Sequence, residues 1–344
     1  MYSPLRAVGA AIGRAVFGRP TGNVVLMYHR ISRTDVDPWA LCVNPANFAE
    51  QMNVLNTLAN PASLDQLLEA QPGEPSVAVT FDDGYVDNLD SALPILQWHD
   101  VPATIFVSTG YIGMASGYWW DELEAIFLAP GLLPSNHLKL SIGERSHCWQ
   151  IDPGDLQYGI EDCATHRGWI AWKHPAPTSR HAVFHQVWNV LRQLKPEQRI
   201  EAISRIRDWA GSAGDRSSAR CMTADELREI SRGSLVRVGS HTITHSRLSQ
   251  LSDSNQWKEI TGSKATLEEI LEQPVESFSY PFGDGSDYTN RTVAAVRNAG
   301  YRQACSNFEG AVGRSSDRFQ LPRLHVQDWN GGEFEAWLRP YLAL

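Results

Sequence analysis

Short apolar runs rich in β-branched and aromatic residues alternate with amphipathic stretches over residues 23–113 and 222–330. The runs predict strands, and the stretches with apolar residues three or four positions apart predict helices. Strands that alternate with helices pair in parallel, with the helices outside, so the pattern predicts an α/β fold. The expected strands are 23–30, 77–81, 103–108, 235–239, 277–280, 302–305 and 320–326; the expected helices are 48–58, capped by Asn47, 64–70, 87–98, 224–232, 252–272 and 289–299.

Residues 114–221 interrupt this alternation. Helical spacing at 119–128 and 178–210 predicts a mostly helical insertion beside or over the open end of the strands. At the chain ends, residues 1–22 are expected to form an N-terminal helix or arm, and residues 331–344 a C-terminal helix. The insertion is expected to shape a site at the strand ends rather than to carry the chemistry.

The expected strand 77–81 ends in two adjacent carboxylates. Asp82 and Asp83 follow it directly, and Gly84 lets the chain turn sharply. The alternation of side chains relaxes at a strand end, so one carboxylate can hold a cation while the other stays free as a base. A strand followed by an ordinary Asp-Gly turn is the alternative.

Two histidines follow the expected strand 235–239. His241 and His245 are four positions apart, and one helical turn there would place both imidazoles on one face. Imidazole and carboxylate groups are the ligands of catalytic zinc sites that keep an open position for water. His181 and His185 have the same spacing, but the sequence places no acid beside them, and packing is the favoured role for that pair.

Three motifs occur in one order along the chain: T-F-D-D-G at 80–84, S-H-T-x-x-H at 240–245 and S-Y-P-F-G at 279–283. Together they resemble the polysaccharide deacetylases, carbohydrate esterase family 4 with the NodB-type domain, whose third motif is R-P-P-Y-G. The resemblance covers residues 24–113 and 222–328. It implies a distorted (β/α) barrel of six to eight strands, catalytic residues at the strand ends, and hydrolysis of an N-acetyl amide on a sugar.

The resemblance assigns a role to each motif. It implies that Asp83, His241 and His245 bind a divalent metal, with Zn²⁺ favoured over Co²⁺ or Ni²⁺. It implies that Asp82 is the general base that takes a proton from water. It also implies that the backbone N–H of Phe282 stabilises the oxyanion.

Substrate contacts are expected at two places. Tyr280 and Pro281 belong to the third motif, and Trp119 and Trp120, at the start of the insertion, offer indole faces for packing against sugar rings. Burial in the core of the insertion is the alternative for the two tryptophans. The family's D-x-x-D-W segment is absent after the strand 302–305, so the resemblance does not define the acetyl pocket.

The acid that protonates the leaving amine has two candidates. The family places this histidine on a late L-x-L-H strand, whereas here the early run that ends in His29 has that character. This order resembles a circularly permuted subgroup that includes deacetylases of biofilm poly-N-acetylglucosamine. His325, in the late strand, is the alternative acid. Ser279 replaces the arginine of the third motif, and Arg323 is expected to supply that charge beside Asp82.

Composition limits the kinds of molecule that the protein is expected to bind and the compartment in which it is expected to work. The net charge of −9 argues against nucleic acid, because phosphate binding needs a basic surface, and suits a neutral or cationic glycan. Five cysteines with wide spacings and no C-x-x-C favour reduced thiols. The N-terminal apolar run is too short to span a membrane and has no clear signal-peptide pattern. A cytoplasmic enzyme acting on a glycan precursor is expected, with peripheral membrane contact as a further possibility.

Two other functions stay open at this point. A deacylase of another sugar-linked group, such as an O-acetyl ester or an N-formyl amide, would use the same water, metal and oxyanion hole. A non-catalytic glycan-binding protein of the same fold is the second alternative. It would not need a free base beside the metal, so Asp82 argues against it.

Overall fold

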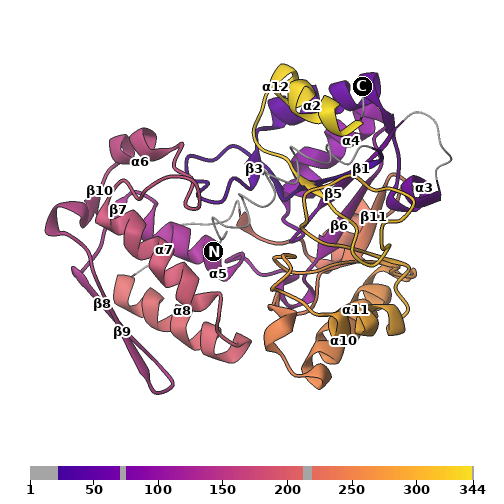
Figure 1. Cartoon of the computed structure of the whole chain (residues 1–344). Helices are drawn as coiled ribbons and strands as arrows, with labels where there is room; N and C mark the ends of the chain where they lie inside the picture. Colours follow the sequence, from indigo (N-terminus) through magenta and orange to yellow (C-terminus); the bar gives the residue numbers. More distant parts are fainter. Residues whose placement is uncertain (1–21, 70–74, 212–218, 343–344) are drawn as a thin grey trace, which may run out of the picture.

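A curled, parallel β-sheet forms the centre of the larger of two bodies in the protein (Figure 1). The computed structural model describes residues 22–69, 75–211 and 219–342. The strand order is β13-β12-β11-β6-β5-β1-β14, with β4 beside β5, and all neighbouring strands are parallel. This half-barrel confirms the expected α/β fold. Its strands are β1 (Val24–Tyr28), β4 (Asn60–Pro61), β5 (Ser76–Phe81), β6 (Ala103–Val107), β11 (Val236–Ser240), β12 (Ser277–Ser279), β13 (Gln303–Cys305) and β14 (Leu324–His325).

The sheet buries both faces, which is why its strands are nearly continuous apolar runs. Alternate residues point to opposite faces: Leu26 packs in the large core shared with the helices, whereas Val25 packs on the other face with Ala78 and Phe106. The inner packing is tight, since a Cβ at Gly239 would lie 2.5 Å from the Phe106 ring. The interior of the half-barrel is therefore filled, and polar residues gather at the strand ends.

Helices cover the outer face of the sheet (Figure 1). The first of them, α2, begins earlier than expected, because Asn44 rather than Asn47 is its cap. The Asn44 side chain accepts from the backbone N–H of Ala46, and Pro45 suits the first helical position. These outer elements are α2 (Pro45–Leu58), the π-helical turn η1 (Asn88–Ala92), α4 (Leu93–His99), α9 (Ala224–Ile230), the 3₁₀ turn η5 (Leu248–Gln250), α10 (Asp253–Leu271), α11 (Asn290–Asn298) and α12 (Gly331–Leu342). The short helix α3 (Leu64–Glu69) packs instead with Val25 and Ala78 on the other face.

The segment after β6 forms a separate body beside the half-barrel, with its own hydrophobic core (Figure 1). The single helix expected at 178–210 is two helices, because Pro196 starts a new one. A β-hairpin, β8–β9, was not expected, although exposed and buried residues alternate along β8. The elements are η2 (Thr109–Tyr111), α5 (Trp119–Phe127), β7 (Gly131–Leu132), β8 (His137–Ile142), β9 (Arg145–Gln150), η3 (Pro153–Asp155), β10 (Gln157–Tyr158), α6 (Ile160–His166), α7 (Ser179–Leu191) and α8 (Pro196–Ala210).

The last expected strand, 320–326, is much shorter in the structure. β14 contains only Leu324–His325, and Leu321 forms an isolated bridge to Cys305. Pro322 lies between them and cannot donate a ladder hydrogen bond. The short strand nevertheless pairs with β1, so this late segment forms the edge strand of the sheet on that side.

Three further expectations concern the whole chain. The N-terminal arm, residues 1–22, lies almost wholly outside the described residues. The five cysteines are free, as expected, and Cys148 is the exposed one. Within the described ranges, no helix has the length and apolar character needed to cross a membrane.

Candidate active site

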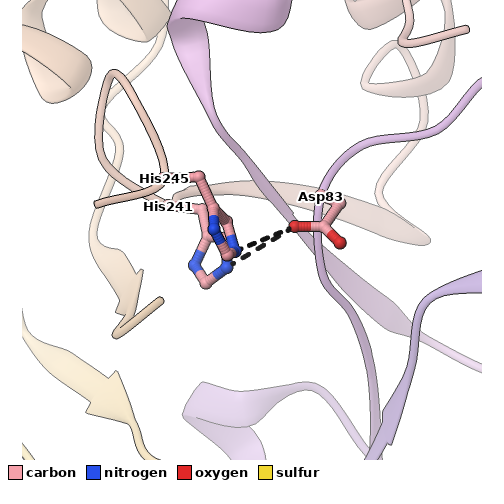
Figure 2. A group of neighbouring side chains, drawn as sticks. All are labelled: Asp83, His241 and His245. Carbon is pink, nitrogen blue, oxygen red and sulfur yellow. Dashed lines mark ion pairs between the residues drawn. The ribbon is translucent and has the colours of Figure 1, made fainter. Parts of the chain in front are cut away.

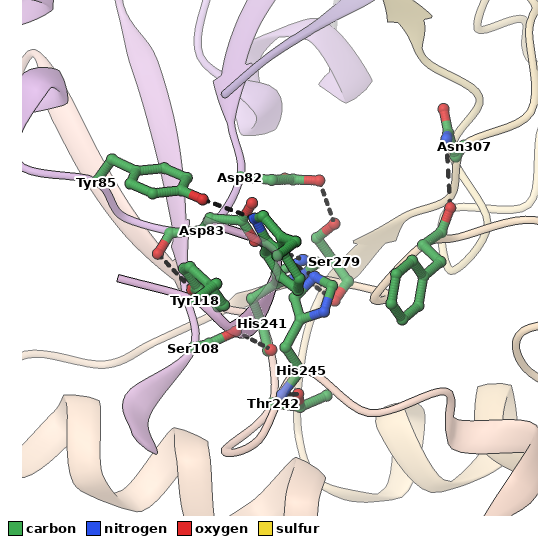
Figure 3. A network of polar contacts seen from close by, with 12 residues as sticks. Asp82, Asp83, Tyr85, Ser108, Tyr118, His241, Thr242, His245, Ser279 and Asn307 are labelled. Carbon is green, nitrogen blue, oxygen red and sulfur yellow. Dashed lines mark hydrogen bonds and ion pairs between the residues drawn. The ribbon is translucent and has the colours of Figure 1, made fainter. Parts of the chain in front are cut away.

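Two strand ends bring the candidate site together at one edge of the sheet. β5 and β11 are separated in the sheet by β6 alone, and parallel strands end at the same edge. Asp83 and Gly84 follow β5 with left-handed φ angles of 76° and 70°. This sharp turn lets Asp82 and Asp83 face different partners, although they are neighbours in sequence (Figure 3).

Asp83, His241 and His245 are, within the described part of the chain, the one group of side chains placed to hold a metal ion (Figure 2). Asp83 Oδ1 lies 3.7 Å from His241 Nε2 and 3.3 Å from His245 Nε2. This oxygen is buried and accepts no hydrogen bond from the described residues. A buried carboxylate oxygen that faces two imidazole nitrogens fits a divalent cation, which would satisfy all three atoms.

The loop that carries the two histidines is not a helical turn, which corrects the expectation from their spacing. Thr242 and His245 have positive φ angles of 67° and 51°, and the two imidazole centroids still lie 4.8 Å apart. Glu259, on α10, holds the loop by accepting from the backbone N–H groups of Ile243 and Thr244. Backbone strain of this kind persists only where the surroundings fix it, and here a buried carboxylate does so.

Hydrogen bonding and burial set the protonation of the ligand side chains. His241 Nδ1–H donates to the carbonyl oxygen of Ser279 at 2.8 Å, so the lone pair of Nε2 faces Asp83. Burial lowers the pKa of His241 and of His245, which keeps both rings neutral. Burial, followed by the charge of Asp82, raises the pKa of Asp83 well above its ordinary value. A bound cation would act in the opposite direction.

Asp82 is paired with an arginine from the end of the chain. Arg323 Nη1 and Nη2 each donate to one carboxylate oxygen of Asp82 at 2.7 Å, and Nη2 also donates to Ser279 Oγ at 3.0 Å. Burial alone would raise the pKa of Asp82, but Arg323 and His241 hold it well below its usual value. The structure thus brings Arg323 to Asp82 at the position where Ser279 replaces the family's arginine.

Both candidate acids lie beside Asp82. His29 follows β1 and His325 ends β14, and their ring centroids are 5.8 Å apart. Burial lowers the pKa of His29 to about 3, against the charge of Asp82, and lowers the pKa of His325 to about 4. His29 Nδ1 and His325 Nε2 are buried without a hydrogen-bond partner among the described residues. Each ring therefore has one buried nitrogen without a protein partner, and the geometry does not distinguish the two candidates.

The third motif contributes Phe282 to the surroundings of the metal group. Phe282 has a φ angle of 60°, its ring centroid lies 4.8 Å from that of His245, and no described residue accepts its backbone N–H. Tyr280 and Pro281 are buried, and the Tyr280 ring stacks on Tyr288 at 4.0 Å. The expectation that these two side chains contact substrate is therefore not supported, because both pack in the core.

Comparison with known proteins identifies the family. The family model described as polysaccharide deacetylase matches residues 69–137 and 179–304, which is more than half of the chain. The chain belongs to the polysaccharide deacetylase family. It is therefore a hydrolase that deacetylates carbohydrates. Residues 138–178, between the two matched segments, include almost all of the hairpin β8–β9 and the helix α6.

Relatives of this deacetylase share most of its length. The protein named "Putative polysaccharide deacetylase YxkH" of Bacillus subtilis (strain 168) is 22% identical over 327 residues, which covers 93% of this chain and 77% of that protein. The Streptococcus pyogenes deacetylase PplD in complex with acetate matches with a TM-score of 0.56 and 18% identity, over 94% of this chain and 99% of that one. IcaB from Ammonifex degensii matches with a TM-score of 0.54 and 16% identity, over 93% of this chain and 97% of that one. At these identities the structural matches show a common fold.

The strand order of the deacetylase agrees with the permuted arrangement. β1 precedes β5 in sequence and pairs with it along its full length, and the residue after β1 is His29. β14, which carries His325, lies on the other side of β1. The strand beside the first motif is thus an early one, as the resemblance to the permuted subgroup implies.

Trp119 and Trp120 form no open platform in the deacetylase. Only 4% and 5% of their surfaces are exposed. Trp120 stacks on Tyr118 at 4.3 Å, donates its indole N–H to the Tyr85 hydroxyl at 2.9 Å, and packs 4.8 Å from the ring of His245. Both tryptophans are core residues behind the metal group, because α5 is buried along its whole length.

Two residues that hold the proposed metal ligands were not predicted from the sequence, because they bind the backbone of those ligands rather than their side chains. The Tyr118 hydroxyl donates to the backbone carbonyl of Asp83 at 2.7 Å, and the Ser108 hydroxyl donates to the carbonyl of His241 at 2.8 Å (Figure 3). Ser108 directly follows β6, so its place at a strand end was a usable signal. Tyr118 comes from the insertion, and no local pattern connects it with Asp83.

The second histidine pair packs inside the insertion. His181 Nδ1 lies 2.9 Å from the Thr178 hydroxyl, and its ring packs edge-on against Trp169 at 4.7 Å. His185 contacts the ring of Trp39 at 6.0 Å. Neither belongs to the metal group found among the described residues. Packing, the role favoured from the sequence, accounts for both.

Proposed function

We propose that this deacetylase removes N-acetyl groups from a carbohydrate with a divalent metal held by Asp83, His241 and His245. The observation that carries the proposal is the division between two adjacent carboxylates: Asp83 faces the imidazoles, and Asp82 faces Arg323. Hydrolysis of an amide needs an activated water, stabilisation of the oxyanion and a proton for the amine. The site has a group suited to each need.

The donor set of one carboxylate and two neutral imidazoles leaves coordination positions open for water and substrate. A divalent cation bound there lowers the pKa of water and polarises the acetyl carbonyl. The protein holds the ligand side chains in place. The Ser279 carbonyl accepts from His241, and Glu259 accepts from the loop before His245. Zn²⁺ is the proposed ion, with Co²⁺ or Ni²⁺ as alternatives, because such sites select by geometry and availability.

Asp82 is the proposed general base. Two hydrogen bonds from Arg323 fix the plane of its carboxylate and keep it ionised. The backbone N–H of Phe282 is the proposed donor to the oxyanion, since its left-handed turn is held by Asn307, which donates to the carbonyl oxygens of Phe282 and Gly283. A proton can then pass from water to Asp82 while negative charge develops on the acetyl oxygen.

His29 is the proposed acid, with His325 as the alternative. The charge of Asp82 is the main influence that raises the pKa of His29 against burial, whereas at His325 the main opposing influence is a hydrogen bond that the ring donates to the backbone of Ala40. Asp82 therefore acts more directly on His29, although burial leaves the pKa of His29, about 3, below that of His325, about 4. His29 is also held at its backbone, where Asn88 donates to its carbonyl oxygen at 2.9 Å.

A screen of acetylated sugars tests the proposal. The metal-loaded protein is expected to release acetate from N-acetylated sugars, and Asp82→Asn to reduce turnover by about 10²–10⁴ with metal still bound. Asp90→Asn, an exposed carboxylate near the same strand, is the matched control and should leave turnover unchanged. Hydrolysis of O-acetyl or N-formyl sugars in place of N-acetyl ones would assign the deacylase alternative. Full turnover in Asp82→Asn would remove the base assignment.

A further inference from the structure

Aromatic side chains from two distant segments meet beside Phe282. Trp39 lies on the loop between β2 (Arg30–Ile31) and β3 (Cys42–Val43), and Trp188 lies on α7. Their rings are 4.2 Å apart and inclined by 32°. Trp188 meets Phe282 edge-on at 6.5 Å, and Phe282 meets His245 at 4.8 Å. A continuous series of aromatic contacts therefore leads from the metal group to Trp39.

Exposure distinguishes these rings from the centre of the site. Asp82, Asp83 and the two histidines of the metal group are each no more than 5% exposed. In contrast, Trp39, Trp188 and Phe282 are partly exposed. Ligand sites are lined mostly by apolar and aromatic side chains, and these partly exposed rings are next to the buried centre. The two tryptophans therefore lie where the part of a glycan beyond the acetyl group would extend.

Trp39 packs against Phe184 and Trp188 of α7. Its indole Nε1 is buried and has no acceptor among the described residues, which opposes folding rather than favouring it. The loop from β2 to β3 nevertheless crosses from the half-barrel to the insertion, as Figure 1 shows, and places Trp39 against α7. Ala171 reinforces this crossing by donating its backbone N–H to the carbonyl of Pro38 at 2.8 Å.

Trp188 is fixed relative to the third motif by an ion-pair cluster. Arg192, one turn later, lies 5.4 Å from the Trp188 ring and 4.7 Å from the Phe282 ring. Its guanidinium pairs with the buried Asp287 at 3.1 Å, and Arg247 pairs with the same carboxylate at 2.6 Å. The end of α7 is therefore held to the segment that follows Phe282, and Trp188 keeps a defined place beside the site.

We propose that Trp39 and Trp188 form a platform for the sugar ring next to the one that is deacetylated. The C–H face of a pyranose packs on indole, and indole rings lose little conformational entropy on binding. Such a platform makes the enzyme prefer an oligosaccharide over a single sugar. The inference rests on the proposed function, because it places the acetylated ring at the metal group.

Kinetics on two probes test the platform: N-acetylglucosamine and its pentasaccharide, with the metal-loaded enzyme and acetate detection. Trp188→Ala and Trp39→Ala are expected to raise KM for the pentasaccharide about tenfold, with little change on the monosaccharide. Trp188→Phe, which keeps an aromatic face, should retain most of the affinity. Trp98→Ala, on the outer helix α4 and 86% exposed in the wild type, is the matched control and should change neither value.

Three outcomes overturn the inference: unchanged pentasaccharide KM in both alanine variants, equal losses on both probes with a lower melting temperature, or equal losses in Trp188→Phe and Trp188→Ala. Calorimetric binding of the pentasaccharide separates this failure from failure of the proposed function. Absence of acetate release by the wild type, with binding that weakens in Trp188→Ala, would refute the N-deacetylase activity and support the platform. Absence of pentasaccharide binding to the wild type would refute the platform.

Discussion

The buried pair between Arg323 and Asp82 allows a quantitative prediction. Two charge-assisted hydrogen bonds at 2.7 Å join the side chains, which are 1% and 6% exposed. Arg323→Met keeps most of the apolar volume but leaves the carboxylate buried and unpaired. Breaking a buried pair in this way costs about 3–5 kcal/mol. The free energy of unfolding is expected to fall by that amount, and turnover by about 10²-fold, because the base loses its orientation.

Urea denaturation of the metal-free protein at pH 7 measures the loss, and a double variant identifies its cause. Asp82→Asn combined with Arg323→Met leaves no charge buried alone, so it should recover most of the lost stability. Arg339→Met is the control, since Arg339 pairs with Glu335 on the exposed face of α12 and should cost less than about 1 kcal/mol. A double variant as unstable as Arg323→Met would refute the electrostatic reasoning.

Three further predictions address metal, acid and pH. His241→Ala should lose most of the bound metal by elemental analysis, and full occupancy would move the site elsewhere. His29→Ala should reduce turnover more than His325→Ala in metallated protein, and the reverse result would assign the acid to β14. Hydrogen bonding from Arg220 lowers the pKa of Glu226 from 4.5 to about 2, so this carboxylate stabilises the fold above pH 4.5 and loses that effect as pH falls toward 2. Arg220→Gln should therefore show a smaller drop in melting temperature between pH 5 and pH 3, and an unchanged drop would contradict it.

The residues of the metal group could be found from the sequence, but the backbone that positions them could not. Asp83 and His241 each follow closely after a buried strand, and parallel strands bring such positions to one edge. The spacing of the two histidines suits a helical turn and also suits a loop. Thr242 and His245 adopt left-handed angles, and the group that fixes the loop is Glu259, on a separate helix. Local spacing holds no information about such a partner.

The aromatic residues show the same limit more strongly. Trp119 and Trp120 were singled out because they stand at the start of the insertion, yet α5 is buried on all sides. Trp39 and Trp188 reach the site from a loop and a helix that only the folded chain brings together. Whether an indole has a free face depends on which distant segment covers it, and hydrophobic pattern does not specify that. The first strand of the hairpin, β8, could have been predicted from the sequence, since its alternation of exposed and buried residues has the strand period.

Two departures from the family pattern have a single physical explanation in the sheet. β1 and β14 are adjacent strands, although they lie near opposite ends of the chain, and Leu26 pairs with Val79 of β5 on one side and Leu324 on the other. Arg323 therefore reaches Asp82 from β14 as directly as a residue from β12 could. The Ser279 side chain accepts a hydrogen bond from Arg323 at 3.0 Å, and an arginine at position 279 would compete for the same carboxylate. Ser279 in the third motif and Arg323 before β14 are therefore two sides of one replacement: the arginine that pairs with the base comes from a different strand. This is possible because the order of strands in the sheet decides which side chains meet Asp82.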